Sequence, residues 1–422
     1  MMTFIDAAPS PFHACLEAAK QLQSAGFEER SESDAWPSGP GHHFVRRGGS
    51  LVAWSVGAHH RPHDGFRIVG AHTDSPNLRV RPRPDVGRVG VRQLAVEVYG
   101  GPLLNSWLDR DLGLSGRVVV RGAHGPEERL LLVARPLLRI PQLAIHLDRE
   151  ITTEGLRLNP QQHLSPIWGL GQAAPDDFAT FLGQELDCAP KSILAWDLMA
   201  HDLTPSVLLG VDNELVSAPR LDNLCSCWAG LEALVGVVAG ETPLTHIPVL
   251  VLFDHEEVGS TSDRGASSPL LPAMLERIVI GLGGGREEVL RTLASSVCCS
   301  ADNAHATHPN YSERHEPNHP IALNGGPVLK VNSNVRYATD ATSAATFVLA
   351  CEQAGVPLQR YSHRGDLPCG STIGPITASR LGIPTVDVGA PQLAMHSARE
   401  LGGAADPGFY TAAMAAFLAP TA

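Results

Sequence analysis

Two adjacent carboxylates, Glu256 and Glu257, follow closely on an apolar run of residues 249–253. Such a run predicts a buried β-strand, so the pair should emerge at the end of that strand. Adjacent carboxylates repel each other, and both stay ionised in a shielded site only beside strong positive charge. A divalent metal supplies this charge, with one carboxylate as ligand and its neighbour able to take a proton from metal-bound water. An acidic turn that caps a helix is the alternative, and the pair alone does not decide between them.

Four further potential metal ligands stand near the end of a predicted strand or the start of a predicted helix: His72, Asp222, Asp302 and His396. In an open α/β sheet the carboxyl ends of the strands face a common crevice, where residues distant in sequence meet. Taken singly, Asp222 is explained as a helix cap, Asp302 as part of a turn with Asn303, and His396 as a surface histidine. Together with the paired glutamates, the four residues favour a metal centre with imidazole and carboxylate ligands.

Strands and helices alternate in the first and last parts of the chain. Period-2 and short apolar runs predict strands over residues 51–56, 66–71, 247–253, 297–300, 358–361 and 385–388. Helical periodicity predicts helices over residues 10–25, 224–238, 270–280 and 339–354, and a last helix that ends near Leu418. This alternation predicts an α/β fold with a mostly parallel mixed sheet covered by helices on both faces.

Residues 85–213 have a different pattern, with short predicted strands and few long helical segments. Short strands are predicted over residues 91–99, 115–121, 130–134 and 207–215, and the stretch between the last two reads as loop-rich. At 422 residues the chain is also too long for one ordinary core. We therefore predict a discontinuous catalytic domain of residues 1–84 and 214–422 and an inserted β-rich domain of residues 85–213.

Composition narrows the class of partner. The net charge of −12 argues against nucleic acid or an anionic membrane as the main partner. No apolar stretch approaches the length of about 20 residues that a membrane helix needs. The amino terminus shows no export signal, and the eight cysteines form no C-x-x-C pattern, so we expect a reduced, cytoplasmic protein.

Six short segments hold most of the residues considered for chemistry: residues 70–76 (GAHTDSP), 219–223 (PRLDN), 254–260 (DHEEVGS), 300–305 (SADNAH), 327–332 (PVLKVN) and 394–400 (AMHSARE). In the order and the amino-acid sequence of these segments, the chain resembles the aspartyl aminopeptidase family of dinuclear zinc peptidases over essentially its whole length. The resemblance implies a zinc-dependent metallo-aminopeptidase that prefers peptides with amino-terminal Asp or Glu.

The resemblance also implies the metal ligands. Asp222 would bridge two zinc ions in each subunit, which its two carboxylate oxygens permit. His72 and Asp302 would complete the protein ligands of one ion, and Glu257 and His396 those of the other. Sets of imidazole and carboxylate ligands also accept Mn²⁺ or Co²⁺, so these ions are possible substitutes.

Glu256 and Asp74 would act beside the metals. The resemblance implies that Glu256 is the general base, which takes a proton from a metal-activated bridging water and returns it to the leaving amine. Asp74 stands two residues after His72, so its carboxylate would accept the second ring N–H of that histidine and fix the tautomer.

Cations near these segments would recognise an acidic substrate. Lys330 is the first choice for the partner of the substrate carboxylate, with Arg336 and His305 as further substrate-binding candidates. The resemblance implies that the insertion mediates dimerisation, that dimers assemble into a homo-dodecamer, and that His146 reaches the active site of a neighbouring subunit.

Two other functions remain open from the sequence. A dinuclear-zinc carboxypeptidase or N-acyl-amino-acid deacylase would share the ligands but bind a carboxylate or a blocked amine instead of a free α-amine. A non-enzymatic assembly with a structural metal is disfavoured, because structural zinc sites are generally closed and often rich in cysteine.

Overall fold

The computed structural model describes residues 1–240 and 243–421 and divides the chain into two compact units. The first comprises residues 1–74, 206–395 and 400–422, and the second comprises residues 75–205 and 396–399. The boundaries differ from the predicted ones, since the second unit begins at Ser75 instead of Asp85. The reason is the pairing of β5 (Asn77–Arg88), which joins the sheet of the second unit through β6 (Val91–Tyr99).

A nine-stranded mixed sheet forms the centre of the first unit, in the order β1-β2-β3-β13-β4-β14-β18-β16-β17. Its parallel core is β13, β4, β14 and β18, and antiparallel pairing joins β3 to β13 and β16 to β18. The strands are β1 (Glu28–Glu29), β2 (Gly41–Arg47), β3 (Ser50–Val56), β4 (Phe66–His72), β13 (Ile247–Phe253), β14 (Val297–Ala301), β16 (Val328–Val331), β17 (Gln359–Ser362) and β18 (Thr385–Gly389). The predicted mostly parallel sheet is confirmed.

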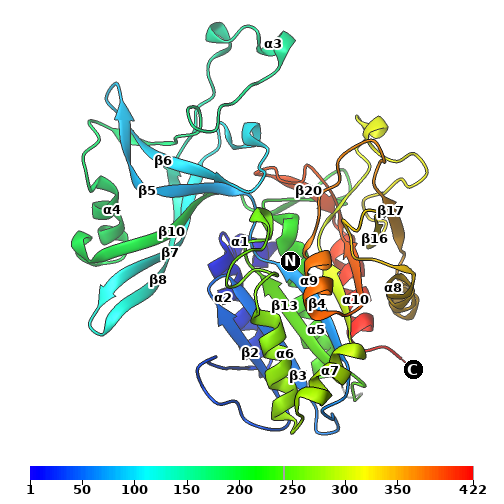
Figure 1. The fold of residues 1–422 in the computed structure, drawn as a ribbon. Helices are drawn as coiled ribbons and strands as arrows, with labels where there is room; N and C mark the ends of the chain where they lie inside the picture. The colour runs from blue at the N-terminus through cyan, green and yellow to red at the C-terminus, as the bar shows by residue number, and fades with distance from the viewer. Residues whose placement is uncertain (241–242, 422) are drawn as a thin grey trace. The chain divides into compact units, whose positions relative to one another are not determined.

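Helices cover both faces of this sheet, and Figure 1 shows them around β13 and β4. They are α1 (Met2–Ala7), α2 (Pro11–Ser24), α5 (Leu221–Ala239), α6 (Leu270–Gly281), α7 (Arg286–Ala294), α8 (Ala341–Ala354), α9 (Ile373–Leu381) and α10 (Asp406–Leu418). Strand β13 shows why both faces need cover. Leu250 and Leu252 pack into the apolar cluster of α2, α5, α8 and α10, whereas Val249 and Val251 pack into that of α6, α7 and α9. A strand buried on both sides reads as a continuous apolar run.

The second unit is built on a six-stranded antiparallel sheet, in the order β8-β7-β10-β5-β6-β9. Besides β5 and β6 its strands are β7 (Leu112–Gly122), β8 (Gly125–Leu138), β9 (Ile167–Leu170) and β10 (Ile193–Asp202). The short helices α3 (Ile151–Glu154) and α4 (Asp177–Glu185) lie in the same unit. The stretch that reads as loop-rich therefore holds two strands and two helices, and Phe178 of α4 is part of the apolar core.

A third sheet lies in the first unit, in the order β11-β12-β20-β19-β15. Its strands are β11 (Val207–Leu209), β12 (Leu215–Ala218), β15 (Ala304–His305), β19 (Pro391–Leu393) and β20 (Glu400–Gly403). The single strand predicted over residues 207–215 is wrong, because β11 and β12 form an antiparallel hairpin. Between them Gly210 and Asn213 have left-handed φ values of 103° and 58°, which turn the chain.

Helix α5 corrects one expectation about membrane spans. By length and composition alone it could cross a membrane, with a mean hydropathy of 1.3, so the expectation that no apolar stretch reaches such a length is wrong. However, 67% of its apolar window is buried inside the protein. It is apolar because it packs into the core between the central sheet and α10.

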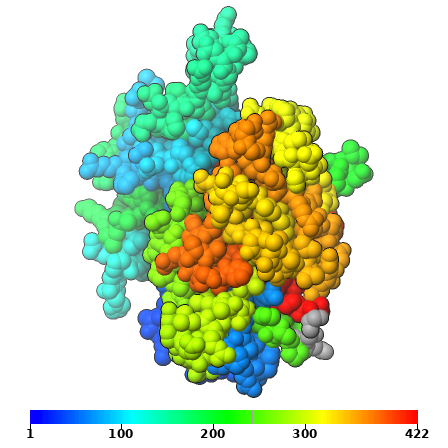
Figure 2. All heavy atoms as spheres, turned by 45° about the vertical axis from the view of Figure 1, so that its right-hand side comes forward, coloured from blue at the N-terminus to red at the C-terminus, as the bar shows by residue number. Residues whose placement is uncertain are grey.

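Strands β16 and β17 end one edge of the central sheet. Residues of about 310 to 380, yellow to orange in Figure 2, gather on the face of the first unit that is turned to the viewer. The sequence candidates Lys330 and Arg336 belong to this part of the chain.

Candidate metal centre

Three neighbouring parallel strands bring potential ligands to one edge of the sheet. His72 is the last residue of β4 and pairs in register with Phe253, the last residue of β13. Glu256 and Glu257 follow β13, and Asp302 follows β14, which pairs with β4 on the other side. Parallel strands that end together place their following residues together. The convergence predicted from the sequence is therefore present for these residues.

Asp222 joins them from the amino-terminal end of α5, where its backbone is non-helical, with a ψ of 103°. Its Oδ1 lies 3.4 Å from Nε2 of His72, and Oδ1 of Asp302 lies 3.5 Å from the same nitrogen. The ligand atoms of His72, Asp222 and Asp302 lie within 4.8 Å of one another, and so do those of His72, Glu256 and Glu257. His72, Asp222 and Asp302 are buried.

The tautomer of His72 suits a metal ligand. Its Nδ1–H donates to the carbonyl oxygen of Asp74 at 2.9 Å, because that oxygen can only accept. In the neutral ring that a metal binds, Nε2 then carries the lone pair, and it is the nitrogen that faces Asp222 and Asp302. A backbone carbonyl that holds the second ring nitrogen is a common support for a metal-binding histidine.

The electrostatics of the site favour bound cations. Burial alone would lower the pKa of His72, but the carboxylates of Asp222, Asp302 and Asp74 raise it well above its usual value. Burial also raises the pKa of Glu256 to about 8, and the neighbouring carboxylates add to this against the opposing effect of His72. Buried carboxylates at such distances need positive charge. Imidazole and carboxylate donors are those that zinc takes in catalytic sites, so the donor set fits this ion.

Asp74 has a second task beside the one predicted. Its carboxylate oxygens accept the backbone N–H groups of Glu256 and Glu257, both at 3.1 Å. The nearer contact to Nδ1 of His72 is the carbonyl oxygen of Asp74, while its Oδ1 lies at 3.5 Å. The predicted support of the histidine ring thus comes mainly from the backbone, and the carboxylate orients the paired glutamates.

A buried polar network supports the segments that carry Asp222 and Asp302. The backbone N–H of Asp222 donates to Oε2 of Glu400 at 3.0 Å. Asn303 donates through Nδ2 to the carbonyl oxygen of Leu221 at 2.8 Å and to Oε1 of Gln392 at 2.6 Å. Gln392 in turn donates to Oε1 of Glu400 at 3.3 Å, so the two ligand-bearing segments are linked.

His396 belongs to the second unit. Its Nδ1–H donates to the carbonyl oxygen of Gly101 at 3.0 Å, and its backbone has a left-handed φ of 67°. In this tautomer Nε2 is the nitrogen that a metal would take. Its assignment as a ligand stays a prediction.

Lys330 is buried, with 2% of its surface exposed. Its Nζ donates to the carbonyl oxygens of Asp302 and Asn303, at 2.9 and 3.3 Å, and lies 3.7 Å from Oδ2 of Asp302. The ammonium also lies 5.1 Å from the centre of the Tyr337 ring. The predicted cation is therefore beside a predicted ligand, and it holds the segment that carries that ligand.

The other substrate-binding candidates are exposed. His305 lies 6.3 Å from the Tyr361 ring, and crowding by protein atoms and the Lys330 ammonium lower its pKa to about 4 although its side chain is exposed. Arg336 lies on the loop between β16 and α8, where its guanidinium forms no hydrogen bond or ion pair with the residues that the structure describes. His146 lies on a 3-10 turn of the second unit, residues 145–147.

Two kinds of neighbour were missed from the sequence. Tyr337 and Tyr361 lie beside Lys330 and His305, and nothing in their local sequence marks them. Arg264 pairs with Asp254 at the start of the paired-glutamate turn. A signal for Arg264 exists, because it is the one Lys or Arg between Glu257 and residue 270.

Comparisons with known proteins agree with this chemistry. A family model described as Aminopeptidase I zinc metalloprotease (M18) matches residues 4–418. The probable M18 family aminopeptidase 2 of Streptomyces coelicolor is 55% identical over 421 residues, which cover 100% of this chain and 97% of the relative.

Solved structures match over the whole chain as well. A chain in the cryo-EM structure of the Ape4 and Nbr1 complex superposes with a TM-score of 0.94 at 36% identity and covers 99% of this chain and 84% of that one. The S. cerevesiae mApe1 dodecamer gives a TM-score of 0.84 at 26% identity, with 99% and 94% covered.

Proposed function

Because the chain belongs to the M18 family of zinc aminopeptidases, we propose that it removes amino-terminal Asp or Glu residues from peptides at a site for two zinc ions. The observation that carries the proposal is the convergence of His72, Asp222, Asp302 and the Glu256–Glu257 pair. These residues come from four separate segments of the first unit, and their donor atoms suit zinc.

His72, Asp222 and Asp302 would hold one ion, and Glu257 and His396 would share Asp222 with the other. The position of Nε2 of His72 between two carboxylates supports the first set. Bound zinc would supply Lewis acidity, which lowers the pKa of a water and polarises the scissile carbonyl. Mn²⁺ or Co²⁺ would serve as substitutes, since the ligand set contains no thiolate.

Glu256 would move the proton. Its backbone N–H is fixed by Asp74, which aims the side chain from a rigid turn. In the proposed reaction its carboxylate takes a proton from the attacking water and gives it to the leaving amine. Burial, together with the neighbouring carboxylates, raises its pKa to about 8 before a cation is bound, and a bound cation would favour the ionised form that a base needs.

Lys330 would attract the acidic side chain of the substrate. Two of its three N–H groups go to the carbonyl oxygens of Asp302 and Asn303, which leaves one for a carboxylate. His305 would lie beside that side chain, since Lys330 acts on its pKa and both residues neighbour the Tyr337–Tyr361 pair. Arg336 is the alternative cation. The free α-amine would bind to a carboxylate or a metal of the centre.

We also propose that the chain works as a homo-oligomer, a dodecamer built from dimers, since the similar S. cerevesiae mApe1 forms a dodecamer. His146 would then act in a neighbouring subunit. Its surroundings support a contact with another chain, because Leu143, Ile145 and Leu147 expose 57%, 50% and 76% of their surface. The cytoplasm is the proposed location, in line with eight cysteines that are all unpaired.

A panel of chromogenic substrates tests the proposed function. Hydrolysis of Asp- and Glu-p-nitroanilide should exceed that of the Leu, Lys and Ala compounds by more than tenfold in kcat/KM, and N-acetyl-Asp-p-nitroanilide should not be cleaved. Faster cleavage of the acetylated compound would favour a deacylase, and cleavage of a carboxyl-terminal residue from an acetylated peptide would favour a carboxypeptidase. Equal rates for the Asp and Leu compounds would contradict the preference for acidic residues but not the aminopeptidase activity.

A further inference from the structure

The turn that presents Glu256 and Glu257 starts from a residue in a disfavoured backbone conformation. His255 has a φ of 67°, in the left-handed region that residues with a side chain seldom adopt. Such a conformation persists only where the surroundings determine it. Asp74 holds the two glutamates on the far side of the turn, so the near side needs its own support.

Asp254 supplies part of this support from the end of β13. Its side chain is 1% exposed, and its Oδ1 accepts the backbone N–H of His255 at 2.9 Å. Its Oδ2 accepts Nε–H of Arg264 at 3.0 Å, in an ion pair whose arginine side chain is 15% exposed. Because an unpaired buried carboxylate is strongly disfavoured, Arg264 keeps Asp254 turned inward, where it holds His255.

Ser50 forms a second link between Asp254 and Arg264. The backbone N–H of Asp254 donates to Oγ of Ser50 at 2.8 Å, and that hydroxyl donates to the carbonyl oxygen of Arg264 at 2.8 Å. The residue before it must be glycine, since a Cβ at Gly49 would lie 2.4 Å from Oδ2 of Asp254. The loop that carries Arg264 is thus fastened to β3 as well as to β13.

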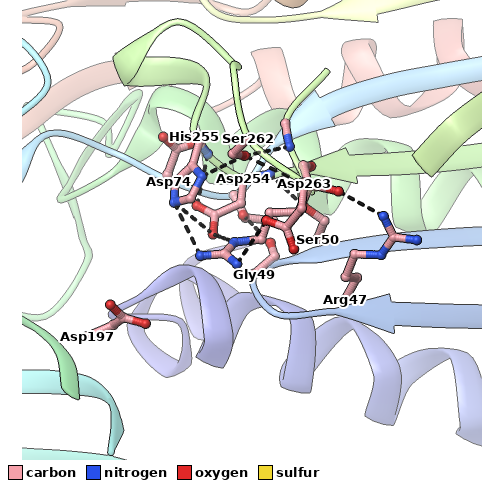
Figure 3. Close-up of polar contacts among 12 residues, drawn as sticks. Arg47, Gly49, Ser50, Asp74, Asp197, Asp254, His255, Ser262 and Asp263 are labelled. Carbon is pink, nitrogen blue, oxygen red and sulfur yellow. Dashed lines mark hydrogen bonds and ion pairs between the residues drawn. The ribbon is translucent and has the colours of Figure 1, made fainter. Parts of the chain in front are cut away.

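The ring of His255 is fixed from the other end of the loop. Oγ of Ser262 accepts the backbone N–H of Gly265 at 3.0 Å, so its own hydrogen is available for Nδ1 of His255 at 2.8 Å. The second ring nitrogen lies 3.6 Å from Oδ2 of Asp254 and 3.5 Å from Nη2 of Arg264, so the arginine also contacts the ring directly. Figure 3 shows Asp254, His255, Ser262 and Asp74 in one region of polar contacts.

We propose that Arg264 is a positioning residue for the proton-transfer carboxylate of Glu256. It acts through Asp254 and His255, and among the residues that the structure describes its guanidinium has no hydrogen bond or ion pair with a predicted metal ligand. The proposal rests on the proposed function, in which Glu256 moves the proton. Arg264, through Asp254, holds the backbone of His255 at the start of the turn, and Asp74 holds the backbone of Glu256 and Glu257 after it. Together the two contacts orient the side chain of Glu256.

Arg264→Met tests the proposal with Asp-p-nitroanilide, with zinc in excess and bound zinc measured by elemental analysis. A small displacement of a reacting group lowers turnover sharply, so kcat should fall about 10- to 100-fold. KM should stay within about twofold and bound zinc should stay unchanged, because the substrate pocket and the ligand side chains are not altered. Arg264→Lys keeps the charge and should restore part of kcat.

A double-mutant cycle separates positioning from general damage. In a Glu256→Gln background, Arg264→Met should change the residual rate less than about threefold, because the group that it positions is no longer a base. An equal loss in both backgrounds would overturn the proposal, and so would a loss of kcat that follows loss of zinc. A wild-type rate in Glu256→Gln alone would instead refute the role of Glu256 in the proposed function.

Two further variants keep the test decisive if Arg264→Met fails to fold. Ser262→Ala removes the contact to the His255 ring and leaves the buried ion pair in place, so it should lower kcat with the same dependence on Glu256. Asp263→Asn is the matched control, since Asp263 pairs with the same guanidinium at 3.3 Å but is 67% exposed. Its kcat should equal that of the wild type, and a fall as large as that of Ser262→Ala would contradict the assigned route through His255.

Discussion

Neighbouring carboxylates in this centre differ in task because their surroundings differ. Asp74 is fully buried and uses both oxygens to hold the backbone of Glu256 and Glu257, while its carbonyl oxygen fixes the ring of His72. In the proposed function Glu257 is a metal ligand, and Glu256 beside it transfers the proton. The role of each carboxylate therefore depends on which groups its individual oxygen atoms contact, more than on its residue type.

Replacement of Glu256 by Gln removes the proposed base and keeps the shape of the side chain. We expect kcat to fall about 10²- to 10⁴-fold, which is the usual contribution of a general base. Bound zinc, measured by elemental analysis, should remain at the wild-type level because Glu257 and the other ligands are intact. A rate within threefold of the wild type would show that another group moves the proton.

Replacement of Lys330 by Met tests the acidic preference. The loss in kcat/KM should be at least about tenfold greater for Asp-p-nitroanilide than for Ala-p-nitroanilide, since only the acidic substrate loses a charged hydrogen bond. A smaller loss common to both substrates is expected too, because Nζ also holds the backbone of Asp302. Lys20→Met, at an exposed lysine of α2, serves as the control. Equal losses for the two substrates would limit Lys330 to the support of Asp302.

At the scale of elements, α2 shows how a local sequence rule creates a pH-dependent feature. Ser10 caps the helix by accepting the backbone N–H of His13 at 3.4 Å, and Pro11 opens the first turn. The cap also places the His13 ring 2.7 Å from Oγ of Ser10, in a buried position near the positive end of the helix. Burial, with Arg220 and Lys20, lowers the pKa of His13 to about 4.

His13 should make the protein less stable in mild acid. Between a pKa of about 4 in the folded state and its ordinary value of 6.5 when unfolded, only the unfolded chain binds the proton, so stability rises with pH over this window. From pH 7 to pH 5 the wild type should lose about 2 kcal/mol through this residue. His13→Gln should remove that part of the slope in urea unfolding at the two pH values. Identical slopes would show that His13 is not buried as a neutral ring.

Elements with a clear pattern were predicted from the sequence, and elements defined by their partners were not. The apolar run of β13 and the cap of α2 predict both elements within one or two residues. Strand β10 was missed because Asp197, His201 and Asp202 interrupt its pattern, and its place comes from pairing with β7 and β5. Helix α9 was missed because Gly374 and Pro375 stand in its first turn, where they favour a loop when the sequence is read alone.

At the scale of the whole molecule, the sequence predicted the residues of the candidate site but not the contacts that hold them in place. Strand ends pointed to His72, Glu256, Glu257 and Asp302, because parallel strands share a direction. Neither the group that each Asp74 oxygen contacts nor the pairing of Arg264 with Asp254 could be predicted from the sequence. Such contacts join segments that meet only after folding, so no local pattern carries them.

Removal of metal should affect the stability of the protein as well as its activity. Without cations the carboxylates around His72 repel one another, whereas an ion that binds only the folded chain stabilises it by about 2.7 kcal/mol at 100 times its Kd. Dialysis against a chelator should abolish hydrolysis and lower Tm by several degrees, and zinc should restore both. An unchanged Tm in protein shown to be free of metal would contradict a metal centre built on buried carboxylates.

The order of the ligands along the chain has a consequence for synthesis. His72 precedes the whole of residues 75–205, whereas Asp222, Glu257 and Asp302 follow them. A ribosome that has translated as far as Arg220 has made only His72 of these four, and Asp302 is added last. In the proposed function His396 is a ligand as well, so a nascent chain would have no complete centre, and no means to cleave other peptides, until translation had passed residue 396.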